Sequence, residues 1–199
     1  MKTLAKAAAL ATPLALSLAL GGCISVFPKS KPVQMYSFGS QVTPPSKPVS
    51  GVMILKGATV FPPASGADRI LTVTGDQNAY IADVRWVAPA AQLFDQAVLR
   101  AFDMQGSPRL VERGEPLSAP FTLRLDVREF DVRYPGPVAR VSVRATLVRN
   151  QDRSLAGETL FQEDVPASGN SQTAIVAAMD QAVSKVAGEV RDFAGGNAK

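Results

Sequence analysis

Cys23 is the one cysteine of the 199-residue chain, and the position of its thiol indicates a covalent modification. A basic start precedes an apolar run over residues 7–20, and two glycines separate that run from the cysteine. This order of charged, apolar and small segments is typical of a secretory signal peptide. The apolar run is shorter than the roughly 20 residues that a membrane-spanning helix needs. We therefore expect residues 1–22 to be a signal peptide that is removed before Cys23.

The four residues Leu20-Gly21-Gly22-Cys23 resemble the bacterial lipobox. The cysteine of a lipobox is acylated through a thioether bond, becomes the first residue after cleavage and is then usually N-acylated, with palmitate as a common acyl group. The alternative is an ordinary signal peptide that ends near a buried cysteine. Small neighbours and the absence of a second cysteine favour lipidation. The sequence therefore predicts a bacterial lipoprotein that is anchored to a membrane through Cys23.

The rest of the composition restricts the chemistry of the mature chain. There is no histidine, and acylation of the one cysteine would leave no thiolate and no disulfide. A Ser-His-Asp triad and a zinc site with nitrogen or sulfur ligands are therefore excluded, and we expect no metal and no cofactor. Two of the 21 Lys and Arg lie in the signal segment, so the mature chain is close to neutral against its 17 Asp and Glu. This balance gives no indication of a nucleic-acid partner.

Motifs of common enzyme classes do not occur in the sequence. G-x-S-x-G, G-x-x-x-x-G-K-[ST] and G-x-G-x-x-G are missing. A hydrolase with paired carboxylates is the remaining enzymatic alternative, because such pairing is spatial. Asp126 and Asp131, however, lie beside arginines on a predicted strand, where charged cross-strand neighbours are the simpler explanation. We predict no catalytic residues and a protein that is not an enzyme.

Two segments have the apolar spacing of amphipathic helices. The first covers residues 90–103 and carries apolar residues at positions 93, 94, 97, 98, 101 and 102. The second has N-cap candidates at Ser168, Asn170 and Ser171, and its apolar stripe runs from position 175 to 193. Gly195-Gly196 is expected to end this helix and to leave a frayed terminus.

The middle of the chain predicts a long β-hairpin with one apolar and one polar face. Apolar and polar residues alternate over residues 121–134, and a change of phase at Glu129-Phe130 indicates a β-bulge. Pro135-Gly136-Pro137 forms the turn. The remaining strand predictions are residues 35–38, 52–55, 139–147 and 157–165, and a hairpin of residues 70–74 and 79–82 around Gly75-Asp76-Gln77-Asn78.

Both helices need an apolar surface, and the one-sided hairpin provides it. We expect a single domain over residues 35–199 with an α/β (α+β) fold, in which a twisted, mixed or largely antiparallel sheet packs against both helices. Residues 23–34 contain Pro28 and Pro32 and read as a semi-extended tether between lipid and body.

The polar face of the hairpin supplies candidate partner-binding residues, namely Arg124, Arg128, Arg140 and Arg144. They are expected to surround Asp126, with Arg144 diagonal to it. Such a stripe could bind an acidic partner or lipid headgroups, although an ion-paired solubilising face is the favoured interpretation. Trp86 is a further candidate partner anchor, for which a core position is favoured.

The chain is similar to the ABC-type transport auxiliary lipoproteins, a family that includes PqiC. The similarity is carried by the cysteine of the lipobox, by Tyr36-Ser37-Phe38, and by Trp86-Val87-Ala88-Pro89 before the first helix. A long β section and a terminal alanine-rich helix complete it, whereas residues 55–69 match only loosely. The resemblance implies a mixed-sheet fold like the anticodon-binding and TolB N-terminal folds, and ring-like self-association as a homo-oligomer.

The resemblance also implies partners. These are an inner-membrane ABC ATPase and permease and an MCE-type protein that bridges the periplasm, in a system that moves phospholipids or related hydrophobic molecules between the membranes. Ile24 stands where aspartate would retain a lipoprotein in the inner membrane, which favours the periplasmic face of the outer membrane. The alternatives are an outer-membrane assembly or envelope-integrity lipoprotein that binds barrel proteins or peptidoglycan, and, third, an envelope hydrolase.

Overall fold

The computed structural model describes residues 32–198, apart from residues 42, 50 and 115–117. The folded body begins at Val33. The predicted signal peptide, Cys23 and the tether up to residue 31 lie outside the described residues. Within the described ranges, no helix has the length and apolar character that crossing a bilayer requires.

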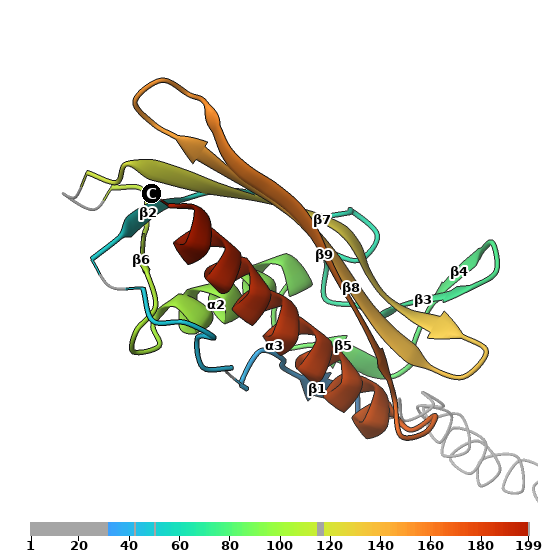
Figure 1. Ribbon diagram of the computed structural model, residues 1–199. Coiled ribbons are helices and arrows are strands. Elements are labelled where there is room, and N and C mark those ends of the chain that lie inside the picture. Colours follow the sequence, from blue (N-terminus) through green and yellow to red (C-terminus); the bar gives the residue numbers. More distant parts are fainter. Residues whose placement is uncertain (1–31, 42, 50, 115–117, 199) are drawn as a thin grey trace, which may run out of the picture. The chain divides into compact units, whose positions relative to one another are not determined.

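The body consists of a seven-stranded mixed sheet, a separate two-stranded sheet, and two helices that lie on one face of the larger sheet (Figure 1). This is the single-domain α+β architecture that the sequence predicts. The elements are β1 (Gln34–Tyr36), β2 (Met53–Val60), β3 (Leu71–Thr74), β4 (Gln77–Tyr80), β5 (Val84–Trp86), α2 (Ala90–Phe102), β6 (Arg109–Val111), β7 (Phe121–Tyr134), β8 (Val138–Arg149), β9 (Leu155–Pro166) and α3 (Gln172–Asn197).

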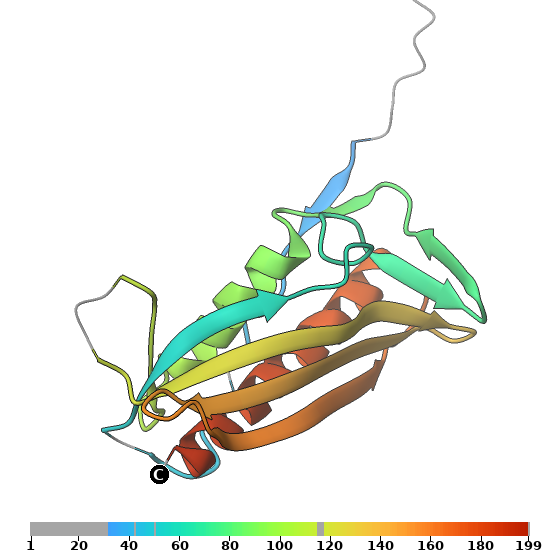
Figure 2. The ribbon, with the colours of Figure 1, turned by 90° about the horizontal axis from the view of Figure 1, so that it is seen from above.

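The long strand β7 organises the larger sheet. β8 pairs antiparallel with β7, and β9 pairs antiparallel with β8. Along the other edge of β7, β2 runs parallel to its first half and β3 runs parallel to its second half. β6 and β4 extend this side by pairing with β2 and β3. Viewed as in Figure 2, β2, β7, β8 and β9 lie side by side, with α3 behind β7, β8 and β9 and α2 behind β2.

The predicted alternation of the hairpin is confirmed. The register between β7 and β8 shifts between Val127 and Glu129, so Arg128 is the extra residue of the bulge that the change of phase predicts. On the helix-facing side, the apolar residues of β8 at positions 139, 141, 143, 145 and 147 are fully buried. The opposite side of the same strands carries the charged residues.

Several strand boundaries differ from the prediction; β1, for example, ends at Tyr36 and not at residue 38. The apolar run 52–55 continues as β2 to Val60, because Lys56 and Gly57 also belong to the strand although neither is apolar. The hairpin of β3 and β4 is tighter than expected, since Gln77 pairs with Thr74 and leaves only two residues for the turn. Gly75 at that turn has a φ of +56°, a conformation that glycine adopts without steric cost.

The first helix agrees with the predicted span, and its apolar positions 93, 94, 97, 98, 101 and 102 are buried. At the start of α3 the Ser171 hydroxyl accepts a hydrogen bond from the Ala174 amide, as an N-cap does. The predicted end of α3 is wrong, because the helix continues through Gly195-Gly196 to residue 197. A Cβ on Gly195 would lie 3.2 Å from the Val49 side chain, so tertiary packing explains this glycine.

Aromatic side chains fill the space between the sheet and the start of α2. The ring of Trp86 meets that of Phe38 edge-on with centroids 4.8 Å apart, and Phe38 lies 5.3 Å from Phe130 of β7. Phe61 joins this cluster to Phe94 of α2. One continuous aromatic core thus joins segments that lie far apart in the sequence.

The Pro-rich segment from residue 39 to residue 49 is fixed to the helices by charged side chains. The Arg191 guanidinium is 1% exposed and donates hydrogen bonds to the carbonyl oxygens of Thr43, Pro44 and Ala101. Its neighbour Asp192 accepts from the backbone amide of Ser46. These contacts pair backbone carbonyl and amide groups of a proline-bearing segment that lies outside both sheets, and they join it to the end of α2.

The approach of this segment to α2 requires Gly39. This residue has a φ of +73°, and a Cβ built on it would lie 2.4 Å from the Cβ of Ala97. We expect Gly39→Ala to lower the free energy of unfolding by about 3 kcal/mol, measured by urea denaturation, because strain and overlap add. Gly75→Ala is the matched control: its φ is also positive, but nothing lies within 4 Å. Equal losses in both variants would contradict a role for the Ala97 contact.

Candidate interaction surface

The helices leave the other side of the large sheet uncovered, and we call this side the outer sheet face (Figures 1 and 2). Its residues follow from strand alternation and from the pairing of β7, β8 and β9. They are Thr122, Arg124, Asp126, Arg128, Glu129, Asp131 and Arg133 of β7, Arg140, Ser142, Arg144 and Thr146 of β8, and Glu158, Leu160, Gln162 and Asp164 of β9, together with Val60 of β2, which pairs with Asp126.

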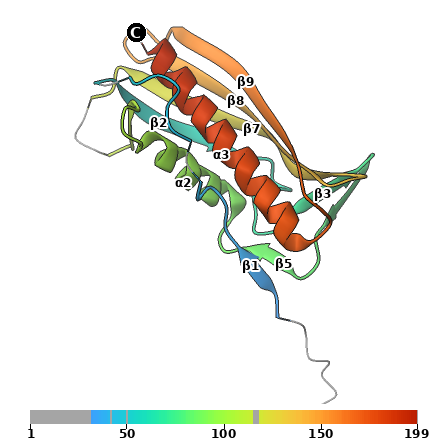
Figure 3. The same cartoon turned by 60° about the horizontal axis from the view of Figure 1, so that its bottom comes forward.

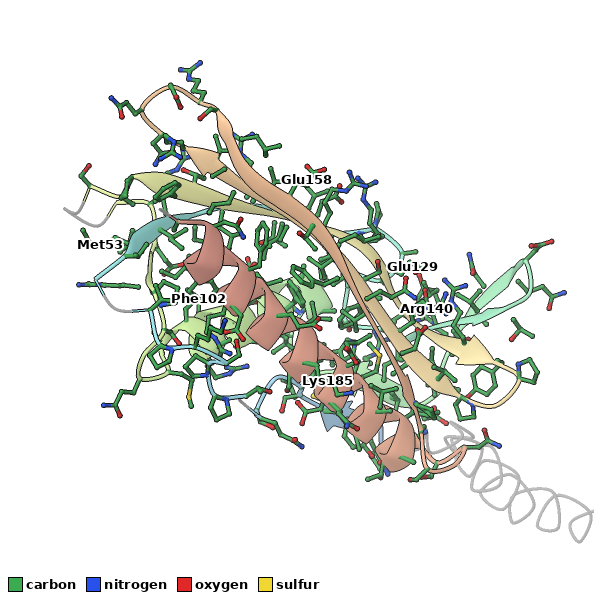
Figure 4. The ribbon with its side chains drawn as sticks, viewed as in Figure 1. Met53, Phe102, Glu129, Arg140, Glu158 and Lys185 are labelled. Carbon is green, nitrogen blue, oxygen red and sulfur yellow. The ribbon has the colours of Figure 1, made fainter. Side chains whose placement is uncertain are left out.

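Arg140 is at the centre of an ion-pair network on this face. Its Nε lies 2.6 Å from Asp164 of β9, and its Nη1 lies 3.9 Å from Glu129 of β7. Arg133 pairs in turn with Glu129 and with Asp131. Figure 4 shows Glu129 and Arg140 near each other on the side of the sheet away from the helices. The network therefore connects three adjacent strands.

The remaining predicted arginines also have carboxylate neighbours, with one exception. Arg128 lies 2.6 Å from Asp126, and Arg144 lies 3.1 Å from Glu158. Asp126 of β7 lies directly opposite Arg144 of β8, so the predicted diagonal arrangement of these two residues is wrong. The bulge does not alter this pairing, because it shifts the register only beyond Val127. The face therefore alternates in sign and is not uniformly positive.

Arg124 is the exception. Its side chain is exposed and makes no hydrogen bond or ion pair with any residue that the structure describes. A Cβ on Gly57 of β2 would lie 3.0 Å from its Cγ, so the stem of Arg124 crosses the strand at a position without a side chain. Its guanidinium is thus available to a carboxylate or carbonyl of a partner.

Two exposed apolar side chains accompany these charges. Leu160 is 51% exposed and lies opposite Arg144, while Val60 is 59% exposed and lies opposite Asp126. The sequence did not assign them to this face, because Leu160-Phe161 and Val60-Phe61 are pairs of adjacent apolar residues in which either member could face the core. The structure turns the phenylalanine inward in both pairs.

The network shifts the acid–base properties of its members. The hydrogen bond from Arg140 holds the pKa of Asp164 below its usual value, although burial opposes this. The same hydrogen bond raises the pKa of Arg140. Burial raises the pKa of Asp131 above its usual value, and hydrogen bonding and charge attraction from Arg133 oppose the rise.

The lowered pKa of Asp164 predicts a pH-dependent stabilisation. Its contribution is fully present above the unfolded value of 3.8 and is lost as the pH falls through the lower folded value. We expect Asp164→Asn to reduce the urea midpoint at pH 6, with the difference from wild type shrinking as the pH falls below 3.8. The control is Asp76→Asn in the β3–β4 turn. A difference that is constant with pH would contradict an electrostatic origin.

The other predicted site residue, Trp86, is not brought to this surface. It is 2% exposed, and its ring packs against Phe38. Its indole nitrogen has no hydrogen-bond partner among the described residues. Trp86 therefore offers no surface to a partner in this structure, which agrees with the core position that the sequence favours. Also within the described ranges, no group of three or more His, Cys, Asp or Glu is placed to hold a metal ion.

Comparison with solved structures identifies the fold. A Xanthomonas campestris protein of the DUF330 family is 25% identical and superposes with a TM-score of 0.75, over 82% of this chain and 96% of that one. An uncharacterized protein that is 15% identical superposes with a TM-score of 0.60, over 82% of this chain and 99% of that one, and shows the fold alone. The molecule thus has the α+β fold of the DUF330 structure.

The sequence matches the family model of the ABC-type transport auxiliary lipoprotein component over residues 40–191. The chain therefore belongs to this family. No curated protein matches the sequence. The family is that of an auxiliary lipoprotein component of ABC-type transport, which agrees with the family that the sequence resemblance predicts.

Proposed function

We propose that this protein is a non-catalytic auxiliary component of an ABC/MCE-type system that moves phospholipids or related hydrophobic molecules between the inner and outer membranes. The observation that carries the proposal is the family match over residues 40–191, in a chain whose residues 20–23 resemble a lipobox. A lipid anchor on a body of this transport family would suit a protein that works at a membrane beside a transporter.

The proposed location is the periplasmic face of the outer membrane. Ile24 follows the cysteine in place of the aspartate that retains lipoprotein in the inner membrane. More than one acyl chain on Cys23 would give stable attachment, whereas a single chain binds only marginally. The body would then meet the periplasm-bridging MCE protein where that protein reaches the outer membrane.

The outer sheet face is the proposed docking surface for this protein partner. Both helices lie on the opposite face of the sheet, so the face is open along three long strands. It combines exposed Leu160 and Val60 with the free guanidinium of Arg124. Apolar side chains together with arginine are a frequent composition of protein interfaces. Because Arg128, Arg140 and Arg144 already have carboxylate partners, we expect Arg124 to contribute more than the other three.

The test begins in intact cells. The protein carries a tag after Lys199, is crosslinked, and is purified from detergent-extracted membranes. We expect an ABC ATPase, its permease and an MCE protein among the recovered proteins. Recovery of barrel-assembly proteins or peptidoglycan-associated proteins in their place would contradict the proposal and support an assembly or envelope-integrity role.

The docking surface is tested in the same experiment with matched charge reversals. Arg124→Glu is expected to reduce recovery of the partner about tenfold, since it places a like charge in a complementary interface. Lys47→Glu makes the same change at an exposed position in the Pro-rich segment, away from the sheet. Equal recovery with both variants would rule out Arg124 as a docking residue.

A further inference from the structure

The two-stranded sheet at the start of the body has an exposed apolar face. β1 and β5 pair in parallel, with Met35 beside Arg85 and Tyr36 beside Trp86. Because side chains alternate along each strand, Tyr36 and Trp86 point toward the core, and Met35 and Arg85 point away from it. Val33 extends the outward set on β1, and Val87 extends it after β5. We call these four residues, Val33, Met35, Arg85 and Val87, the N-terminal ledge.

The apolar members of the ledge are unusually open to solvent. The exposed fractions are 45% for Val33, 64% for Met35 and 54% for Val87. A hydrogen bond of 2.8 Å from the Val87 amide to the Tyr36 carbonyl holds the two strands together at this point. Single exposed apolar residues need no explanation, but three on one small sheet indicate a contact with an apolar partner.

The charges at the ledge nearly cancel. Arg85 pairs with Asp68 at 2.7 Å, and Asp83 lies in the turn before β5. The other nearby cation, Arg69, has its guanidinium 4.1 Å from the centre of the Tyr80 ring. A partner that is recognised mainly by charge is therefore not indicated, whereas an apolar partner with a polar rim is.

The position of the ledge in the chain identifies that partner. Val33 is the first residue of the folded body, and Cys23 precedes it by a short tether. At roughly 3.3–3.6 Å per extended residue, this tether reaches at most about 35 Å. The 26-residue helix α3 is about 39 Å long by itself. The tether is therefore no longer than the body, and the end where the chain enters is held closest to the anchored lipid.

The surroundings of the ledge fit this orientation. Figure 3 shows β1 and β5 beside the ends of the helices at which α2 and α3 begin. A hydrogen bond from the Gln172 side chain at the start of α3 to the Ala82 carbonyl fixes this arrangement. The ledge lies on the helix-covered side of the large sheet (Figures 1 and 3), so its contact with a flat surface leaves the outer sheet face open.

We propose that the N-terminal ledge rests on the bilayer that holds the acyl chains of Cys23, with Val33, Met35 and Val87 in the headgroup region. The contact orients the body on the membrane and presents the outer sheet face to the periplasm. It rests on lipidation of Cys23, which the proposed function also uses, but not on the identity of the transport system.

The test uses the lipidated full-length protein, purified from membranes and placed at one copy per lipid nanodisc of phosphatidylethanolamine and phosphatidylglycerol. Met35→Cys and Val87→Cys each introduce one free thiol for a fluorescent label, because the thioether blocks Cys23. Lipids that carry a nitroxide near the headgroup quench nearby labels. Leu160→Cys on the outer sheet face is the control, since its 51% exposure matches that of Val87.

We expect at least a twofold loss of fluorescence at positions 35 and 87 and little change at position 160, with little dependence on salt because the charges near the ledge nearly cancel. Equal quenching at all three positions, or none at 35 and 87, would overturn the proposal. Disulfide-linked dimers of Met35→Cys in vesicles, without quenching in single-copy nanodiscs, would assign the ledge to a second copy of the chain.

The outcome is separable from that of the proposed function. Quenching at the ledge together with failure to recover ABC and MCE proteins would leave the membrane contact intact and remove only the transport assignment. The labelled positions are exposed, so the variants should fold as wild type does. A circular dichroism melting curve for each labelled protein checks this before reconstitution.

Discussion

Replacing Cys23 with serine is expected to move the protein from the membrane fraction to the soluble periplasmic fraction. Each methylene group that enters the bilayer contributes about 0.8 kcal/mol, so loss of all acyl chains removes nearly the whole binding free energy. Three partly exposed apolar side chains at the N-terminal ledge cannot replace it. Fractionation of cells followed by immunodetection measures the change.

The design must separate lipidation from signal cleavage. A chain that keeps residues 1–22 because it is not processed would stay at the membrane through its apolar run. The Cys23→Ser variant therefore carries a signal peptide that is cleaved without lipidation. Ser25→Ala in the otherwise native chain is the control and should remain in the membrane fraction. Mass spectrometry of the N-terminal peptide should find acyl groups only in the chain with Cys23, and full membrane retention of the serine variant would refute the anchor.

The second large effect is expected at Arg191. Arg191→Met keeps most of the volume of the side chain but removes the donors to the carbonyl groups of Thr43, Pro44 and Ala101. A buried carbonyl that loses its partner costs about 1–3 kcal/mol. Because opening of the segment can rehydrate some of these groups, we expect a total loss of about 2–4 kcal/mol in the free energy of unfolding, measured by urea denaturation.

A matched control shows whether the effect is specific. Arg153→Met removes the same group at an exposed position in the β8–β9 turn and should change stability by less than about 0.5 kcal/mol. Limited proteolysis adds a local readout, since the Pro-rich segment should become cleavable in the Arg191 variant before the sheet does. A stability of Arg191→Met equal to that of wild type would mean that its hydrogen bonds do not hold this segment.

The proposed docking surface and the N-terminal ledge are differently built. The outer sheet face carries alternating charges with Leu160 and Val60 among them, whereas the ledge is apolar with paired charges at its rim. A polar, arginine-containing face suits a protein partner, and an apolar edge beside a short lipid tether suits a bilayer. The two proposals are thus compatible on one molecule and are tested by different measurements.

Periodicity in the sequence was sufficient for the elements that have one apolar side. The α2 span, the alternation of β7 and β8, and the presence of a bulge in β7 followed from it, because each signal is contained within a few consecutive residues. The family resemblance and the architecture of two helices on one sheet also came from the sequence. Lipidation of Cys23, which depends on a local motif, stays a prediction.

Tertiary structure decided what depends on residues far apart in the chain. The parallel pairing of β2 and β3 with β7 joins segments that no local pattern connects. The sequence predicts a helix end at Gly195, but this glycine is a site of close packing with Val49. Arg191, which no sequence pattern marks, is buried against the Pro-rich segment. The physical reason is the same throughout: a residue's type sets the interactions it can make, whereas the neighbours that the fold brings to it determine which of them form.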